Sequence, residues 1–204
     1  MSGVKGAVAI KGRGSDIQLE EVGGPVSVDG SYFGTIALEK LAKPLRFTSP
    51  QTDLSIEAIP GQVSISSGDI SASNVTGPLH LSARSRDVQI NDFTGPLDVT
   101  LERGDLNLRS GLPLGRIQAH SRSGDIRLSL PAAAQFTLNA STHNGDISNP
   151  FGGGLTLESK GRSGTLRGAV GGGAAIDLET QHGDITVQKA VAAGSNTPLE
   201  KLDQ

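Results

Sequence analysis

Residues 67–70 read Ser-Gly-Asp-Ile, and near copies of this tetrad recur down almost the whole chain. The third position of each copy, called the marker below, is Asp in eight copies and Thr in two. The markers are Asp16, Thr35, Asp53, Asp69, Asp87, Asp105, Asp125, Asp146, Thr165 and Asp184. Successive markers lie 16 to 21 residues apart, so ten copies of one unit of about 19 residues account for the chain. A period near 20 residues is typical of a solenoid, in which each unit buries its apolar face by stacking on its neighbours.

Apolar and polar residues alternate directly after the markers. The first residue after each marker is Ile, Leu or Val in all ten copies, and the second is polar in nine. The third is apolar again, except at Asn149 and Gly168. This alternation predicts a half-buried strand. A second short strand is predicted about eight residues before the marker, as in Leu79 and Leu81. The sequence therefore predicts an all-β solenoid.

Glycine directly precedes the marker in seven copies, where we expect a tight corner with positive φ. These residues are Gly34, Gly68, Gly104, Gly124, Gly145, Gly164 and Gly183. Gly-Pro pairs such as Gly77-Pro78 and Gly95-Pro96 indicate a second corner, because proline restricts the backbone that enters the next strand. Glycine and proline thus mark the ends of strands in this chain.

The marker aspartates have two interpretations. Stacked strands place equivalent carboxylates about 4.8 Å apart, where they repel by roughly 1 kcal/mol in water. A carboxylate that accepts backbone N–H bonds in its own turn gains about 1.5–3 kcal/mol. We therefore predict structural turn caps at Asp16, Asp53, Asp69, Asp87, Asp105, Asp125, Asp146 and Asp184. The alternative is a calcium ladder. It is less favoured because one Asp per 18 or 19 residues provides few oxygen ligands for each calcium ion. The prediction is no metal and no cofactor.

Composition narrows the range of functions. The 204 residues carry a net charge of −3 with dispersed Lys and Arg, so no basic stripe favours nucleic acid. No stretch approaches the 18 apolar residues of a membrane span. Zero cysteines exclude disulfides and thiolate metal sites.

The unbroken period predicts one elongated domain over residues 1–191, followed by a flexible tail over residues 192–204. The start, Met1-Ser2-Gly3-Val4, runs into the first predicted strand without a secretory signal. This abrupt start suggests a longer parent protein with an upstream anchor.

Two stretches of the chain resemble a known family. They are Ser66–Leu79 and Leu130–Phe136, the latter followed by Asn144-Gly145-Asp146-Ile147. Both resemble the bacterial adhesin-like family of β-strand-repeat domains of unknown function, over roughly residues 4–190. The resemblance implies a single-stranded right-handed β-helix of about ten coils. It also implies display in the cell envelope or outside the cell, with a protein or another cell-surface macromolecule as partner.

The histidines and their acidic neighbours are the candidates for catalytic residues. His80 and Asp98 occupy equivalent outward positions on adjacent predicted coils. A hydrogen bond or ion pair on a wet surface explains this pair without chemistry. His143 and His182 are predicted to flank corners two coils apart, as solvated turn residues. A carbohydrate-active β-helix enzyme is therefore the less favoured hypothesis, and no catalytic residue is predicted.

Aromatic residues are scarce, which weakens the case for a sugar-binding surface. The chain has no Trp, one Tyr and five Phe, and Phe47 and Phe136 lie at inward strand positions. Tyr32 and Phe33 lie at a corner, where they are either exposed or fill the end of an early coil. Arg103-Gly104-Asp105 is one copy of the repeat corner rather than an integrin-type motif.

Two glycine runs near the C-terminus form a candidate contact surface. They comprise Gly152, Gly153, Gly154, Gly171, Gly172 and Gly173. The runs lie 19 residues apart, so we expect them to stack and let a partner approach closely. The alternative is that the coil narrows there and its corners are loose.

Two classes of function follow from these observations. The first is a non-enzymatic surface or adhesin-like binding module in the form of an extended rod. The second is a structural scaffold subunit, similar to a bactofilin, that self-associates end to end through unpaired strand edges.

Overall fold

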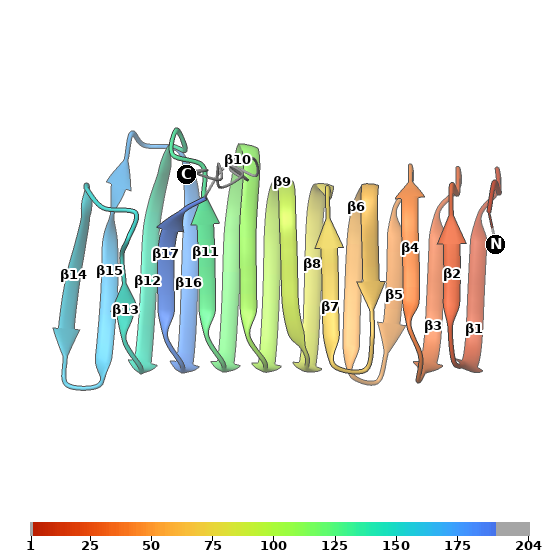
Figure 1. Ribbon diagram of the computed structural model, residues 1–204, viewed down its shortest axis with the longest axis horizontal. Coiled ribbons are helices and arrows are strands. Elements are labelled where there is room, and N and C mark those ends of the chain that lie inside the picture. The colour runs from red at the N-terminus through yellow and green to blue at the C-terminus, as the bar shows by residue number, and fades with distance from the viewer. Residues whose placement is uncertain (1, 191–204) are drawn as a thin grey trace, which may run out of the picture.

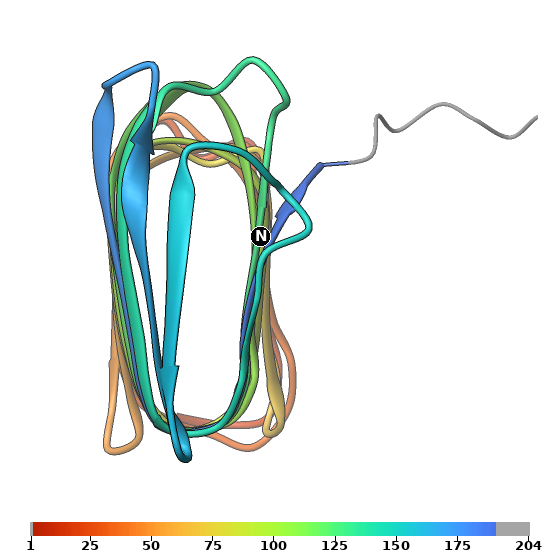
Figure 2. The same ribbon diagram turned by 90° about the vertical axis from the view of Figure 1, so that its left-hand side faces the viewer.

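The computed structural model describes residues 2–190, and this part of the chain is a flattened β tube. Its seventeen strands form one continuous sheet that wraps around an apolar core (Figure 1). Seen along the tube, the cross-section is a long oval with two broad faces, called face A and face B below (Figure 2). None of the described residues forms a helix that could cross a membrane. The predicted tail lies outside the described residues.

Each face is built from strands that alternate along the chain. Face A contains β1 (Val8–Gly14), β3 (Val26–Tyr32), β5 (Leu45–Ser49), β8 (Thr76–Ser85), β12 (Phe136–Asn144), β15 (Ser163–Val170) and β16 (Ala174–His182). Face B contains β2 (Ile17–Glu20), β4 (Ile36–Leu41), β7 (Asp69–Ser73), β11 (Ile126–Leu130), β13 (Ile147–Ser148) and β17 (Ile185–Lys189). The long strands β6 (Thr52–Ile65), β9 (Asp87–Arg103) and β10 (Leu106–Ser123) bend around the tube and contribute to both faces. β14 (Leu155–Lys160) lies across one end (Figure 2).

The predicted alternation is confirmed at every marker. The ten residues that directly follow the markers are all buried, with exposed fractions of 0 to 9 %. Phe47 and Phe136 are also buried, as predicted. Each such side chain contributes roughly 1.5–3 kcal/mol through burial of apolar surface. The core is therefore a set of apolar ladders along the tube.

Most neighbouring coils pair in parallel, with equivalent residues side by side. Leu106, for example, pairs with Val88 on one side and with Ile126 on the other. The register follows the repeat because a shift of one residue would turn every apolar side chain to the solvent.

One coil runs the opposite way around the tube, which corrects the expectation of a uniform winding. β6 is antiparallel to β5 and β8 on face A, and to β4 and β7 on face B. The chain reverses in two hairpins, in which Ser49 Oγ accepts a bond from Thr52 N (3.0 Å) and Ser66 Oγ one from Asp69 N (3.0 Å). β6 therefore advances along the tube axis like the other coils but circles the axis in the reverse direction, so its winding sense is opposite to that of its neighbours.

The last coil is inserted between two earlier ones, so the predicted sequential stacking is wrong here. β16 pairs in parallel with both β10 and β12, and β17 pairs with both β11 and β13. β15 instead runs antiparallel to β12, and β14 runs antiparallel to β15 (Figure 1). All coils present similar apolar ladders and open strand edges, so the repeat alone does not select which neighbours pair.

The insertion also separates the two glycine runs, which were expected to stack. Gly154 packs beside Ala169, whereas Gly171 and Gly173 pack against Gln135. β12 and β15 lie between the two runs, because β16 follows one run and β14 follows the other. The prediction of one shared glycine surface is therefore wrong in its geometry.

Candidate functional site

The marker aspartates form a column at the lower corner, where face A strands lead into face B strands. Five of them accept a backbone N–H from the next coil rather than from their own turn, which corrects the predicted capping geometry. The bonds run from Thr35 N to Asp16 Oδ1 (2.8 Å), Asp105 N to Asp87 Oδ1 (2.9 Å), Asp125 N to Asp105 Oδ1 (2.9 Å), Asp184 N to Asp125 Oδ1 (2.8 Å) and Asp146 N to Asp184 Oδ1 (2.7 Å). The column thus ties neighbouring coils together.

The carboxylates of three predicted caps do not act as acceptors in this column. Asp53 and Asp69 follow the two hairpins that replace the lower corner, and Asp146 is the last acid of the column. Their carboxylates accept no backbone hydrogen bond from residues 2–190. The same column contains the Asp of the Arg103-Gly104-Asp105 corner, where Asp105 Oδ1 is bonded to Asp125 N.

Glycine precedes the marker because the corners stack closely. At Gly124 φ is 137°, and an added Cβ would collide with the carbonyl oxygen of Gly104 on the neighbouring coil. The predicted positive φ is present at Gly104, Gly124 and Gly183, and the prediction is wrong at the other four glycines. At Gly124, backbone stacking adds a second requirement for glycine. Gly68, beside a hairpin, lacks both constraints, since its φ is not positive and no atom lies within 4 Å of an added Cβ.

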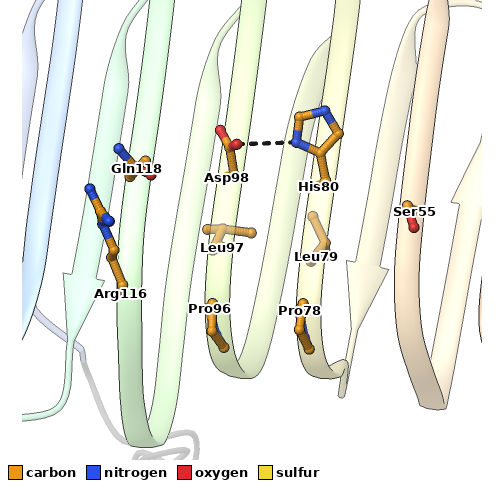
Figure 3. A pocket seen from close by; sticks show the side chains of 9 residues that line it. All are labelled: Ser55, Pro78, Leu79, His80, Pro96, Leu97, Asp98, Arg116 and Gln118. Atoms are coloured by element: carbon orange, nitrogen blue, oxygen red, sulfur yellow. Dashed lines mark hydrogen bonds and ion pairs between the residues drawn. The ribbon is translucent and has the colours of Figure 1, made fainter.

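His80 and Asp98 are adjacent, as predicted from their equivalent positions. Their Nδ1 and Oδ2 atoms are 3.2 Å apart on neighbouring strands β8 and β9 (Figure 3). The pair borders a shallow cavity of about 200 Å³ that Arg116 and Gln118 also line. Both side chains are about half exposed, so water competes for their hydrogen-bonding atoms and the pair contributes little stability.

A second histidine–carboxylate pair escaped sequence analysis. His120 Nδ1 lies 3.3 Å from Glu179 Oε2, because β16 is inserted beside β10. The same insertion brings the corner of His182 next to that of His143, with Asn144 Nδ2 3.3 Å from His182 Nδ1. The predicted separation of two coils between these corners is wrong, and no sequence signal indicates the insertion.

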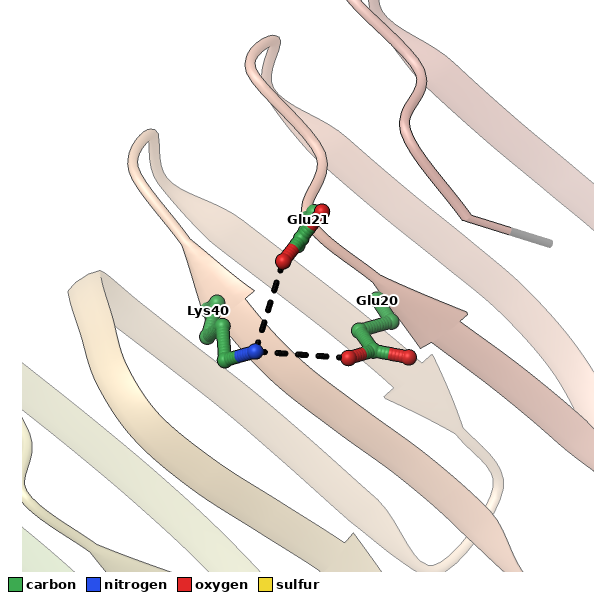
Figure 4. Close-up of polar contacts among 3 residues, drawn as sticks. All are labelled: Glu20, Glu21 and Lys40. Carbon is green, nitrogen blue, oxygen red and sulfur yellow. Dashed lines mark hydrogen bonds and ion pairs between the residues drawn. The ribbon is translucent and has the colours of Figure 1, made fainter.

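At an upper corner, one lysine bridges two acids. Lys40 Nζ lies 3.3 Å from Glu21 Oε1 and 3.4 Å from Glu20 Oε1 (Figure 4). Hydrogen bonds to Glu21 and Glu20 raise the pKa of Lys40 above its ordinary value. This cluster is exposed, so we interpret it as a surface ion pair between neighbouring coils.

Of the two aromatic residues at the corner, one is exposed and the other packs inward. Phe33 is 79 % exposed, whereas Tyr32 is half-buried and packs against the core. Among the described residues, no group of three or more His, Cys, Asp or Glu is arranged to hold a metal ion.

Comparison with known proteins identifies the repeat. A family model described as Toastrack DUF4097 matches residues 5–188, which is most of the chain. No curated protein and no solved structure matches the sequence.

Proposed function

This chain belongs to the Toastrack DUF4097 family, a family of domains of unknown function, and we propose that it is a non-enzymatic binding module. In this proposal the rod is adhesin-like and is displayed in the cell envelope, where it contacts a protein or another surface macromolecule. The right-handed sense of the parallel coils and their number, about ten, belong to the same proposal.

A continuous row of outward polar side chains on face A supports this proposal. The row, in strand order, is Ser27, Arg46, Ser55, His80, Asp98, Gln118, Asp177, Asn139, Arg167 and Thr156, each paired in register with the next. Neighbouring members lie about 4.8 Å apart, so the face A row extends along most of the tube. A rigid row of hydrogen-bonding groups of both charges suits a long polar partner.

The face A row can be tested with fluorescently labelled protein and intact bacterial cells. The triple variant Arg46→Ala, Gln118→Ala, Arg167→Ala removes three spaced members of the row, and we expect it to reduce cell binding at least tenfold. The matched control is Gln89→Ala, Arg127→Ala, Thr186→Ala, which removes three outward groups from face B. Equal loss in both variants, or no binding by the unsubstituted protein, would contradict the proposal.

The alternative function is a self-assembling scaffold, and one end of the tube favours it. β14 pairs only with β15 within the described chain, and Leu157 on β14 is 47 % exposed. An unpaired strand edge with an exposed apolar residue is a template for pairing with another chain. Sedimentation velocity over a hundredfold concentration range separates the two functions. End-to-end polymers would favour the scaffold, and a persistent monomer or dimer favours the binding module.

A further inference from the structure

The reversed coil leaves an opening along the lower edge of the tube, which is the edge where face A strands lead into face B strands. The lower corner after β3 and the one after β8 connect the two faces. Between them the chain turns back in two hairpins, and no segment within residues 2–190 closes the wall there. The two hairpins project from the lower edge of the oval cross-section (Figure 2). A cavity of about 430 Å³ lies at this place, and we call it the mouth. Its lining includes Tyr32, Phe33, Pro50, Gln51, Ser67 and Arg86.

Arg86 lines the mouth with a guanidinium group that lacks hydrogen-bond partners on two of its nitrogens. It occupies the position before the marker Asp87, where seven other copies have glycine. The residue is only 9 % exposed, yet its Nε and Nη1 have no hydrogen-bond partner among the described residues. Burial lowers the pKa of Arg86, and the charge of Asp69 opposes this shift. Buried guanidinium N–H groups without acceptors are costly, so an anion that supplied acceptors would be bound favourably.

The opposite wall of the mouth offers an aromatic surface. Phe33 is 79 % exposed, and the half-buried Tyr32 beside it packs against the core and holds the corner in place. Gln51, Ser67 and Ser31 add amide and hydroxyl groups around the opening, and Arg13 adds a second positive charge. A flat apolar ring, several neutral hydrogen-bonding groups and a guanidinium together match the chemistry of a sugar that carries an anionic group.

We propose that the mouth binds an anionic sugar, with its carboxylate or phosphate on Arg86 and its ring on Phe33. This activity goes beyond the proposed function, because it places a small ligand at one corner rather than a long partner along face A. The hairpins of β6 create the site, so it depends on the reversed coil.

Isothermal titration calorimetry with four probes tests the chemistry of the ligand. Glucuronate and glucose 6-phosphate carry the two candidate anions, while glucose and inorganic phosphate each lack one half of the ligand. We expect at least one anionic sugar to bind with a Kd on the order of 1 mM, and glucose and inorganic phosphate to bind at least about tenfold more weakly. The tighter of the two anionic sugars identifies the anion. Equal affinity for glucose or for inorganic phosphate, or no binding of either anionic sugar at 20-fold higher concentration (~20 mM), would overturn the proposal.

Substitutions test the two walls separately. Arg86→Gln should weaken binding of the anionic sugar at least about tenfold, and Phe33→Ala, at an exposed position that the fold does not need, should weaken it several-fold. The matched control is Arg84→Gln, two residues from Arg86, whose side chain is exposed and points to Glu102 outside the mouth. Unchanged affinity in Arg86→Gln and Phe33→Ala, or an equal loss in Arg84→Gln, would refute the assignment. Thermal unfolding of each variant shows that it is folded.

Discussion

At the residue scale, two residues of the repeat, the marker Asp and the glycine before it, determine the structure of the lower corner. The marker carboxylate bonds to the backbone of the next coil, and the glycine before it allows the coils to approach. A carboxylate column would repel itself, but each Oδ1 in the bonded column faces an N–H donor. Charge-assisted bonds of this kind are stronger than the repulsion between exposed carboxylates.

We predict that Asp105→Ala destabilises the protein by about 1 kcal/mol, because Asp125 N loses its acceptor. For a domain of this size the melting temperature should fall by about 2–4 °C. Asp53→Ala is the control, since Asp53 accepts no backbone bond in the described chain, and it should change the melting temperature by less. Equal effects in calorimetry would show that the column does not stabilise the corner.

Gly124→Ala should be more damaging than the same change at Gly68. At Gly124 the methyl group meets the carbonyl of Gly104 and the backbone has a positive φ, so we expect a loss of about 2 kcal/mol or more. At Gly68 neither constraint exists, and the loss should stay below about 1 kcal/mol. Urea unfolding of both variants measures the difference. Similar midpoints would contradict the stacking argument.

At the element scale, each strand is defined by its alternation and each reversal by its turn. The markers Asp53 and Asp69 lie only 16 residues apart, the shortest interval in the chain, and Thr52 stands where seven of the ten copies have glycine. Ser49 and Ser66 then close hairpins with their hydroxyl groups. The short interval and the altered corner are the only sequence signals of the reversed coil that we find.

Ile126→Asp tests the inward face of a strand against its outward face. Ile126 is fully buried on β11, so a carboxylate there lacks both water and a partner, and we expect a loss on the order of 4 kcal/mol. Arg127→Asp, at the next residue, replaces an outward side chain that donates to Asn107 Oδ1, and should cost less than about 1 kcal/mol. Circular dichroism during urea unfolding distinguishes them. A cooperatively folded Ile126→Asp protein of near-normal stability would contradict the register.

At the scale of the whole molecule, the insertion of β16 and β17 couples distant parts of the chain. These two strands are the only contact surface between the coil of β10 and β11 and the coil of β12 and β13 in the strand pairing of residues 2–190. The coils of a solenoid are stabilised mainly by their immediate neighbours.

We predict that a protein truncated after Gly173 loses order in β12–β15 while β1–β9 remain protected. The physical reason is that β12 would then face an empty place where β16 lies, whereas β7–β9 keep all their neighbours. Hydrogen exchange followed by mass spectrometry reads out both regions in one experiment. Uniform loss over the whole chain, or unchanged protection of β12, would show that the stack is not coupled in this way.

Whether a candidate site could be predicted depends on whether its residues lie on coils that are consecutive in the sequence. The pair of His80 and Asp98 was predicted because these residues lie on coils that are consecutive in the sequence and adjacent in space. The pair of His120 and Glu179 was missed because its coils are adjacent only in space. The mouth was missed for a similar reason, since it exists only where β6 reverses.

The sequence by itself determined where most strands lie, which of their side chains point inward, and where most of the glycine and aspartate corners lie. These features depend on alternation and turn chemistry within a few residues. Only the tertiary structure decided that β6 runs backwards and that β16 and β17 are inserted between earlier coils. Every coil offers its neighbours a similar apolar ladder and the same unpaired backbone groups, so many orders satisfy the local pattern. The order is selected by the free energy of the complete stack, which no single repeat contains.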